Sequence, residues 1–532
     1  MGTLGRTSEV KDMGLDRCVH YLNLGIVLGL GLASAGCSTA NRPDVSADDI
    51  SPVTEAGNGK VASSLSDQRF DGVTLTVTGN KYPIGNAYEA HAKTFEAMTG
   101  AKVVFETVQF GDVYDTIAAD YISGENRYDV IVYTPLWLPD FVQANYLADL
   151  TAQVKADDTL EWDDIVPFFQ KYGGTYDDKV YGIPADGDYY MLYYRSDLLE
   201  QAKLDPPSTW EEYLAIAKQF DGQDLNGDGT PDYGSCLPKK PNHVGWWAFW
   251  SIAGSYLQSQ GTSQGGFFDA ETMQPLTNNA AFAKALDVYK STGDYGPADE
   301  LSHSMDDTRA LFIDGQCALT MDHGNMGALT IAPQSKVVDN VGTTILPGTT
   351  EVLDRKTGKL VACDKFICPY GINGVNHAPY AALIGWTAGV NAASDAKTQE
   401  AAYAFISYVS QPAQANVDVT VGETGFNPYR ISQLTDTETW VKAGMSPAAA
   451  NKYLGGIGAS LNNPNIMLDL TIPNNNGYQQ EILGTALSAF LAGEIGRDQA
   501  MDTITTGWEA LTDDMGREQQ KAIYRTGLAP KL

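Results

Sequence analysis

The chain has 532 residues, and its 35 Lys and Arg against 66 Asp and Glu give a formal net charge of −31 at pH 7. Because like charge repels phosphate, this balance argues against nucleic acid or an anionic membrane surface as the main partner. Hydrophobic residues make up 43% of the chain, enough to bury a large core. The length exceeds what one core usually organises, which predicts two lobes or domains.

The N-terminal segment, residues 1–36, has the layout of an export signal. Residues 22–33 form an uncharged run rich in Leu and Gly, which is too short to span a bilayer permanently. Cys37 after Ala35 and Gly36 resembles a bacterial lipobox, although Ser34 stands where that pattern prefers Leu. We therefore predict an exported protein, periplasmic or at the outer face of the cytoplasmic membrane, with a lipid anchor on Cys37. The alternative is ordinary cleavage after Ala35, which would release a soluble protein.

Export makes the remaining cysteines informative, because disulfides persist in oxidising compartments. Cys363 and Cys368 are close enough in sequence to close a short loop, so we predict this pair together with Cys236–Cys317. Four unpaired buried thiols are the alternative. There is no Cys-x-x-Cys and the six His are scattered, so a zinc site or thiol catalysis has no support.

After residues 37–69, a stretch rich in Ser, Asp, Gly, Ala and Pro that we predict to be a flexible tether, strands and helices alternate. The predicted elements are a strand at 73–77, a helix at 87–99, a strand at 102–107, a helix at 114–123 and a strand at 128–133. Alternation of this kind indicates an α/β fold with a mostly parallel sheet, which binds ligands at the carboxyl ends of its strands. The loops after the first and third strands carry Tyr82, Pro83, Thr134, Pro135 and Trp137.

Five stretches further along the chain are informative through their order and spacing. They are Tyr181-Gly182-Ile183-Pro184 leading to residues 192–198, residues 310–319, Leu346-Pro347-Gly348, residues 385–389 before a helix at 401–409, and residues 491–495 before a terminal amphipathic helix. With this order, the chain from about Phe70 to Gly527 resembles the bacterial extracellular solute-binding proteins of family 1, the maltose-binding-like receptors of ABC importers.

The resemblance implies an α/β, two-lobe fold of the periplasmic-binding-protein type II, with a hinge and a ligand in the interlobe cleft. Residues 70–184 and about 386–432 would form the N-terminal lobe, and residues 185–385 and about 433–532 the C-terminal lobe. It further implies a monomeric receptor without enzymatic activity, which binds a carbohydrate and delivers it to ABC permease subunits.

A carbohydrate cleft needs aromatic platforms and side chains that hydrogen-bond to hydroxyl groups. The candidate ligand-binding residues are Tyr82, Trp137, Asp186, Asp188, Tyr189, Trp246, Trp247, Asn325, Trp386, Asn427, Arg430 and Tyr478, and Tyr190, Trp250 and His323 are further candidates from the same segments. Any one aromatic side chain is more often part of the core than a platform, so Trp137 and Trp386, on predicted loops, are the stronger candidates.

Local geometry divides some of these candidates. On a helix, Trp246 and Trp250 share a face while Trp247 points elsewhere. In an extended segment Tyr189 and Tyr190 point to opposite faces, so at most one of them enters the cleft. Relatives often have Gly-x-Trp where this chain has Gly-Asn-Met, so one stacking residue of the family is absent.

Residues 224–232 form the sharpest local motif. The side-chain oxygens of Asp224, Asn226, Asp228 and Asp232 at positions 1, 3, 5 and 9, the backbone carbonyl of Thr230 at position 7 and Gly at position 6 reproduce the start of an EF-hand-type calcium loop. The bidentate Glu usual at the twelfth position is missing, because Ser235 stands there. We predict a structural calcium ion; a turn stabilised by Asx and Gly residues without metal is the alternative.

The sequence contains few motifs typical of catalysis, and no catalytic cofactor is expected. Residues 261–265 match G-x-S-x-G, but no apolar strand precedes them and no helix follows, so the nucleophile-elbow context fails. Two alternatives to a sugar receptor stay open. The same fold could bind a polyamine, metal chelate or peptide, for which Asp186 and Asp188 are suited, or the chain could be a secreted carbohydrate-active enzyme with paired acids across a cleft.

Overall fold

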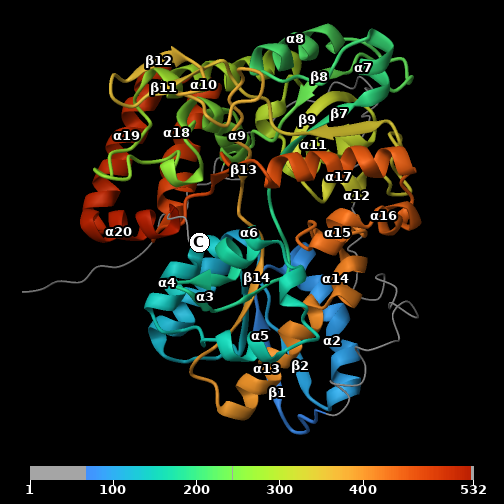
Figure 1. The fold of residues 1–532 in the computed structure, drawn as a ribbon, viewed down its shortest axis with the longest axis vertical. Coiled ribbons are helices and arrows are strands. Elements are labelled where there is room, and N and C mark those ends of the chain that lie inside the picture. Colours follow the sequence, from blue (N-terminus) through green and yellow to red (C-terminus); the bar gives the residue numbers. More distant parts are fainter. Residues whose placement is uncertain (1–67, 242–243, 529–532) are drawn as a thin grey trace, which may run out of the picture. The chain divides into compact units, whose positions relative to one another are not determined.

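A computed structural model describes residues 68–241 and 244–528, all within one unit spanning Ser46–Leu532. The predicted export signal, the lipidation site Cys37 and almost all of the predicted tether lie outside the described residues. Within the described part, two separate β-sheets organise the α/β fold (Figure 1).

The first sheet has the strand order β2-β1-β3-β14-β6. Its strands are β1 (Thr74–Thr78), β2 (Lys102–Phe105), β3 (Val130–Tyr133), β6 (Ile183–Pro184) and β14 (Thr387–Val390). The predicted strands near the start are confirmed with slightly shifted ends, and β1 pairs in parallel with both β2 and β3. Strand β14 is antiparallel to both of its neighbours, so a late segment completes the early sheet.

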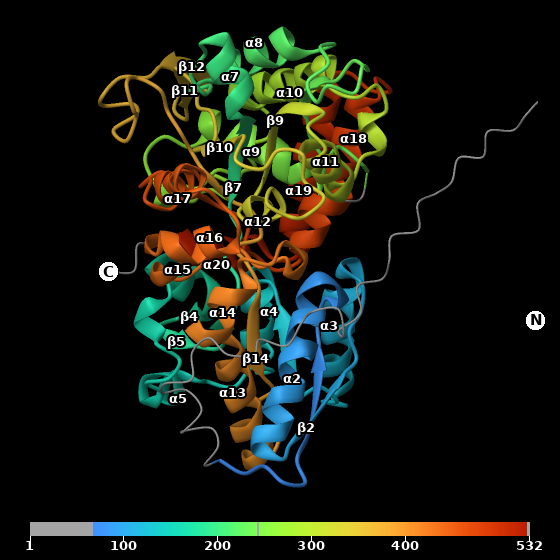
Figure 2. The same ribbon diagram turned by 90° about the vertical axis from the view of Figure 1, so that its right-hand side faces the viewer.

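Helices cover this sheet. They are α2 (Asn86–Thr99), α3 (Val113–Ser123), α4 (Leu138–Gln143), α5 (Thr151–Ala156), α6 (Pro167–Phe169), α13 (Ala396–Ser410) and α14 (Pro412–Asp418). Figure 2 shows α2 and α13 side by side, and Phe405 of α13 packs against Tyr88 and Phe95 of α2. Burial of these rings explains why the apolar positions of both helices have helical spacing.

The second sheet has the order β10-β7-β9-β8, from β7 (Tyr190–Arg195), β8 (Tyr233–Cys236), β9 (Cys317–His323) and β10 (Val341–Thr344). Every residue of β7 and β9 is buried, as expected for central strands. The remaining strands form three two-stranded ladders: β4 (Thr175–Tyr176) with β5 (Lys179–Val180), β11 (Glu351–Asp354) with β12 (Lys359–Ala362), and β13 (Tyr380–Ala381) with β15 (Met467–Leu468).

The other helices follow from residue 196 onwards. They are α7 (Ser196–Ala202), α8 (Trp210–Phe220), α9 (Gly245–Leu257), α10 (Ala280–Thr292), α11 (Met305–Ile313), α12 (Met326–Leu329), α15 (Ile431–Thr435), α16 (Thr437–Ala443), α17 (Pro447–Leu461), α18 (Thr485–Leu491), α19 (Arg497–Asp514) and α20 (Arg517–Leu528). Helix α9 packs on α10, and α17 packs on β10. Trp250 of α9 lies in the core against Phe267 and Trp508.

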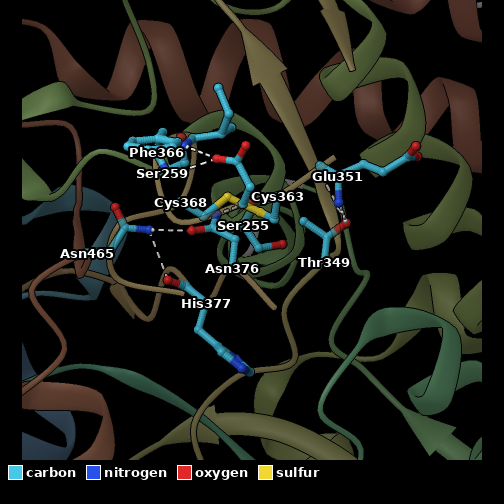
Figure 3. Close-up of a disulfide and its surroundings, with 12 residues drawn as sticks. Ser255, Ser259, Thr349, Glu351, Cys363, Phe366, Cys368, Asn376, His377 and Asn465 are labelled. Carbon is cyan, nitrogen blue, oxygen red and sulfur yellow. Dashed lines mark hydrogen bonds between the residues drawn. A yellow bond between two sulfur atoms is a disulfide. The ribbon is translucent and has the colours of Figure 1, made fainter. Parts of the chain in front are cut away.

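Both predicted disulfides are present. Cys236–Cys317 joins the adjacent strands β8 and β9, and Cys363–Cys368 closes a loop five residues apart in sequence. Figure 3 shows the second disulfide beside Asn376 and Asn465, whose amide Nδ2 donates to Asn376 Oδ1 at 3.3 Å. The alternative of four free thiols is therefore wrong.

Candidate functional site

Two connecting segments, here called passages, run between the two sheets and lie side by side. Residues 185–189 lead from β6 to β7, and residues 382–386 lead from β13 to β14. The amide of Ala185 donates to the Trp386 carbonyl at 3.0 Å, and the amide of Asp188 donates to the Ile384 carbonyl at 3.2 Å. These bonds join the two passages into one ribbon at the junction of the sheets.

The second passage carries unusual backbone geometry. Ile384 has φ 65°, a left-handed conformation that a β-branched residue rarely adopts. At Gly385, φ is 131°, and an added Cβ would lie 2.3 Å from the Asp186 carbonyl oxygen, so only glycine fits. Conformations of this kind concentrate where function constrains the backbone, which directs attention to the residues beside them.

A buried pair of carboxyl groups stands on the first passage. The side-chain amide of Asn427 donates to Asp186 Oδ1 at 2.9 Å and to Asp188 Oδ1 at 2.6 Å. Burial raises the pKa of Asp186 to about 7. Burial, and then the charge of Asp186, raise the pKa of Asp188 well above its usual value.

A second group of polar side chains approaches the pair from β9 and α11. Arg309 donates to both carboxylate oxygens of Asp322 at 2.8 and 2.6 Å, and to Asn325 Oδ1 at 2.8 Å. His323 Nε2 lies 3.9 Å from Asp188 Oδ1. Burial and the nearby Arg309 guanidinium lower the pKa of His323 well below its usual value, so its imidazole is neutral.

Aromatic rings from both sheets meet next to these groups. Phe110 follows β2, and its ring centroid lies 6.5 Å from that of Trp137 and 6.0 Å from that of Trp386. Across from them, Trp247 of α9 has its ring centroid 6.5 Å from that of Phe110 and 5.1 Å from that of His323. The first sheet, the second passage and α9 thus build a common aromatic wall.

Four buried polar atoms of this cluster have no hydrogen-bond partner within residues 68–241 and 244–528. They are Asp186 Oδ2, Tyr190 Oη, Trp247 Nε1 and His323 Nε2. Tyr190 and His323 are in edge contact, with their ring centroids 4.6 Å apart. Buried polar groups are normally satisfied, so a set of unsatisfied donors and acceptors beside aromatic rings is the signature of a place that a polar ligand fills.

Most residues of this cluster are candidates predicted from the sequence. Trp137, Asp186, Asp188, Trp247, Trp386, Asn427 and Asn325 are brought together with Tyr190 and His323. Trp246 lies beside Trp247, with a ring distance of 5.8 Å. As expected, Trp250 faces the core while Trp247 points elsewhere.

Four predicted site residues do not take part in the contacts described above. Arg430 is fully buried and donates to the carbonyls of Leu160, Glu161 and Ser410. It therefore joins the loop at residues 160–161 to the end of α13. The ring of Tyr478 packs at 5.5 Å from that of Trp508 in a helical core. Tyr82 is 43% exposed.

Tyr189 is the fourth of these residues. Its ring faces Phe169 at 6.2 Å and its hydroxyl donates to the Pro428 carbonyl at 3.4 Å, whereas the neighbouring Tyr190 joins the cluster. The alternation of a strand thus places one tyrosine in the site and its neighbour behind it.

Phe110 and the Arg309–Asp322 pair were not predicted. Phe110 follows the predicted strand at 102–107, and the rule that placed Trp137 on a binding edge applies to that loop as well. Arg309 and Asp322 are 13 residues apart on a helix and a strand, and no local pattern signals their contact.

The calcium-like loop lies between α8 and β8. Gly227 and Gly229 have φ of 80° and 87°, as the tight turn requires. In the described part of the chain, no group of three or more His, Cys, Asp and Glu side chains is placed to hold a metal ion. Residues 262–264 of the G-x-S-x-G match form a short 3₁₀ turn, which agrees with a polar loop.

No helix among the described residues is both long and apolar enough to pass through a membrane.

The chain has two β-sheets that are each covered by helices, and residues 185–189 and 382–386 connect them. With unsatisfied polar atoms where the sheets meet, this arrangement defines a two-lobe binding protein. The model of the bacterial extracellular solute-binding proteins matches residues 79–416, and the chain belongs to this family. Sequence and fold therefore agree on a class of binding proteins.

Individual relatives agree with this assignment. A mannitol-binding protein of Pseudomonas aeruginosa is 26% identical over 309 residues, which span 56% of this chain and 61% of that protein. A solute-binding protein of an ABC transporter from Agrobacterium radiobacter, solved with ribitol, is 25% identical with a TM-score of 0.65 and covers 84% of this chain and 100% of its own. One from Agrobacterium vitis, solved with D-mannitol, is 22% identical with a TM-score of 0.63, covers 84% and 99%, and supports the fold alone.

Proposed function

We propose that this protein is the substrate-binding receptor of an ABC importer and that it binds a neutral carbohydrate, a sugar or sugar alcohol, at the junction of the two sheets. The observation that carries the proposal is the set of buried, unsatisfied polar atoms beside aromatic rings. The relatives named for mannitol and solved with ribitol support the same ligand class.

The chemistry of the cluster suits such a ligand. Trp247 Nε1 donates only, Tyr190 Oη and neutral His323 Nε2 can pair with hydroxyl groups, and Asp186 Oδ2 accepts when ionised. Apolar C–H faces would lie on Phe110, Trp137 and Trp386. A hydroxyl group both donates and accepts, so a polyhydroxylated ligand can satisfy this mixed set.

A cationic cargo fits less well. A polyamine needs several ionised carboxylates, whereas Asp186 and Asp188 share the Asn427 amide and both have raised pKa values because they are buried. Asp322 is occupied by Arg309. We therefore favour a neutral cargo over a polyamine.

We also propose that ligand capture, without turnover, is the activity. The carboxyl groups of Asp186 and Asp188 both accept from the Asn427 side-chain amide, so no sugar ring fits between them as it would between the acids of a glycosidase. In the proposed cycle the ligand contacts both lobes only when they are closed, and so stabilises that state. Metal, where present, would be a structural calcium ion.

The organisation inferred from sequence forms part of the proposal. The N-terminal lobe would comprise residues 70–184 and 386–432, and the C-terminal lobe the rest up to residue 532. The monomer would be exported, tethered through residues 37–69 and anchored by a lipid on Cys37. Mass spectrometry of the N-terminal peptide and light scattering in solution test the lipid and the monomer.

Calorimetry against mannitol, ribitol, maltose and spermidine tests the ligand. We expect one sugar or sugar alcohol to bind with 1:1 stoichiometry and Trp247→Ala to weaken it by about 30-fold or more, as for loss of a buried aromatic anchor. Phe366→Ala, at a 74% exposed ring remote from the cluster, is the control and should bind normally. Binding of spermidine alone, or steady hydrolysis of glycosides, would contradict the proposal.

A further inference from the structure

The loop Asp224–Asp232 is not used by the proposed ligand site, and its side chains are arranged around its own backbone. Asp224 accepts hydrogen bonds from the amides of Gly227 at 2.7 Å, Asp228 at 3.1 Å and Gly229 at 3.0 Å. The first two of these bonds go to Asp224 Oδ1 and the third goes to Oδ2, so Oδ2 has room for a further partner. Asp224 therefore holds the turn in shape and keeps acceptor capacity free.

One atom of the loop stands out. Asp232 is 1% exposed, and its Oδ2 accepts from the amides of Leu225 at 2.7 Å and Asn226 at 3.3 Å. Its Oδ1 is buried and has no hydrogen-bond partner in the described part of the chain. A buried carboxylate oxygen left without a donor is costly unless a cation or water meets it.

The charge of the loop is not compensated by its neighbours. Lys336 reaches the loop electrostatically, but its Nζ pairs with Asp314 Oδ1 at 2.6 Å. Among the described residues, no ion pair to Asp224, Asp228 or Asp232 balances the three carboxylates.

From these observations we infer that Asp224, Asn226, Asp228 and Asp232 bind one calcium ion, with the Thr230 carbonyl as a further oxygen ligand. The donors are all oxygens, which calcium prefers, and six to eight of them are needed, so water completes the shell in place of the missing Glu. Asn226 and the carbonyl add to the carboxylates, which alone form no metal-binding group.

The loop also touches structural neighbours, which indicates what the ion does. The Asn226 amide donates to the Asp314 carbonyl at 3.2 Å, and Arg195, at the end of β7, donates to the carbonyls of Gly315 at 3.0 Å and Leu225 at 3.4 Å. The ion therefore fixes the α8–β8 connection against the ends of β7 and α11. The inference deepens the structural-ion part of the proposed function, and it predicts a gain in stability without a change in sugar affinity.

The test uses the purified protein stripped of metal and titrated with calcium by calorimetry, with terbium luminescence and thermal unfolding in parallel. We expect one calcium ion per chain and a rise of about 2 °C or more in melting temperature at saturation. Asp228→Asn, at an exposed position, should lower calcium affinity at least about tenfold, and Asp232→Asn should do the same.

Asp269→Asn is the matched control. Asp269 also accepts from backbone amides in a turn, those of Glu271 at 3.1 Å and Thr272 at 2.9 Å. It should leave calcium binding unchanged. Absence of calcium binding to the unaltered protein, equal losses in the control, or an equal response to magnesium at the same concentration overturns the inference. Sugar affinity, measured with and without calcium, tests the receptor proposal separately from the calcium site. Absence of sugar binding in both states would count against the receptor proposal and not against the calcium site.

Discussion

Two buried charged clusters in this protein differ in how completely they are satisfied. In the first, Lys239 donates to Glu300 Oε2, and the Leu237 amide donates to Glu300 Oε1 at 2.9 Å. The Lys239 ammonium also lies 5.3 Å from the ring centre of Tyr289. In the second, Asp186 and His323 each keep one buried atom without a partner among the described residues.

The difference separates a structural role from a binding role. A buried ion pair whose members are all matched fixes packing and has no capacity for a ligand. A cluster with free donors and acceptors remains incomplete until something polar enters it. Burial alone, which is nearly the same in both places, does not distinguish the two roles.

The largest expected effect is on the satisfied cluster. Lys239→Met leaves Glu300 buried without its partner and should lower the free energy of unfolding by about 3–5 kcal/mol, measured by urea denaturation. The double variant Lys239→Met with Glu300→Leu should recover most of this loss. If the folded double variant binds sugar as tightly as the unaltered protein, the Lys239–Glu300 pair has a structural role only. A large loss of sugar affinity would contradict this distinction between the two clusters.

A smaller effect concerns Asp186 and pH. Its pKa, raised by burial to about 7, exceeds the value near 4 in the unfolded chain, so the native state binds more protons. The free energy of unfolding should therefore fall as pH rises from about 4 to about 7 and then level off.

Asp186→Asn tests this expectation. The variant should flatten the pH dependence and be more stable than the unaltered protein at pH 7, by about 1–3 kcal/mol. The variant should also lower the affinity for sugar, because one carboxylate oxygen that could accept a hydrogen bond is lost. Thermal unfolding at several pH values measures the first effect and calorimetry the second. An unchanged pH profile would mean that Asp186 is ionised in the native state.

Trp247→Phe removes one free donor and keeps a ring. The affinity for sugar should fall about tenfold, while the free energy of unfolding changes by no more than about 1 kcal/mol. Trp250→Phe is the informative counterpart, since Trp250 lies in the core against Phe267 and Trp508. That variant should lose stability and keep affinity, and the reverse pattern would invert the assignment of the two tryptophans.

The smallest effect is expected at Tyr82. Its ring is 43% exposed, so Tyr82→Ala should change sugar affinity by less than about twofold, because exposed contacts at the rim contribute little. A tenfold loss in calorimetry would place Tyr82 in the site of the closed receptor.

The early strands and helices were predictable because their periodicity is local. β1, α2 and α3 bury one face each, and that face can be read from spacing alone. The cysteine pairs followed from their number and the short separation of Cys363 and Cys368. The order of the strands did not follow, since β14 takes its place in the sheet through partners far away in sequence.

The site was predictable in composition but not in detail. Trp137 and Trp386, which were singled out by their position on loops, both lie near Phe110 in the cluster, and their role as sugar platforms stays a prediction. The choice between Tyr189 and Tyr190 depends on register, because Tyr190 pairs with His323 across β7 and β9. The partners of Arg430 could not be predicted, because the carbonyls of residues 160, 161 and 410 are adjacent to it only in the folded chain.

The position of β14 also has a consequence for the order in which the protein can form. Strand β6 reaches the first sheet only through β14, which pairs with β3 on one side and β6 on the other. More than 250 residues separate the end of β3 from residues 387–390, so β14 leaves the ribosome long after β3. The first sheet therefore stays open at one edge until most of the chain has been made.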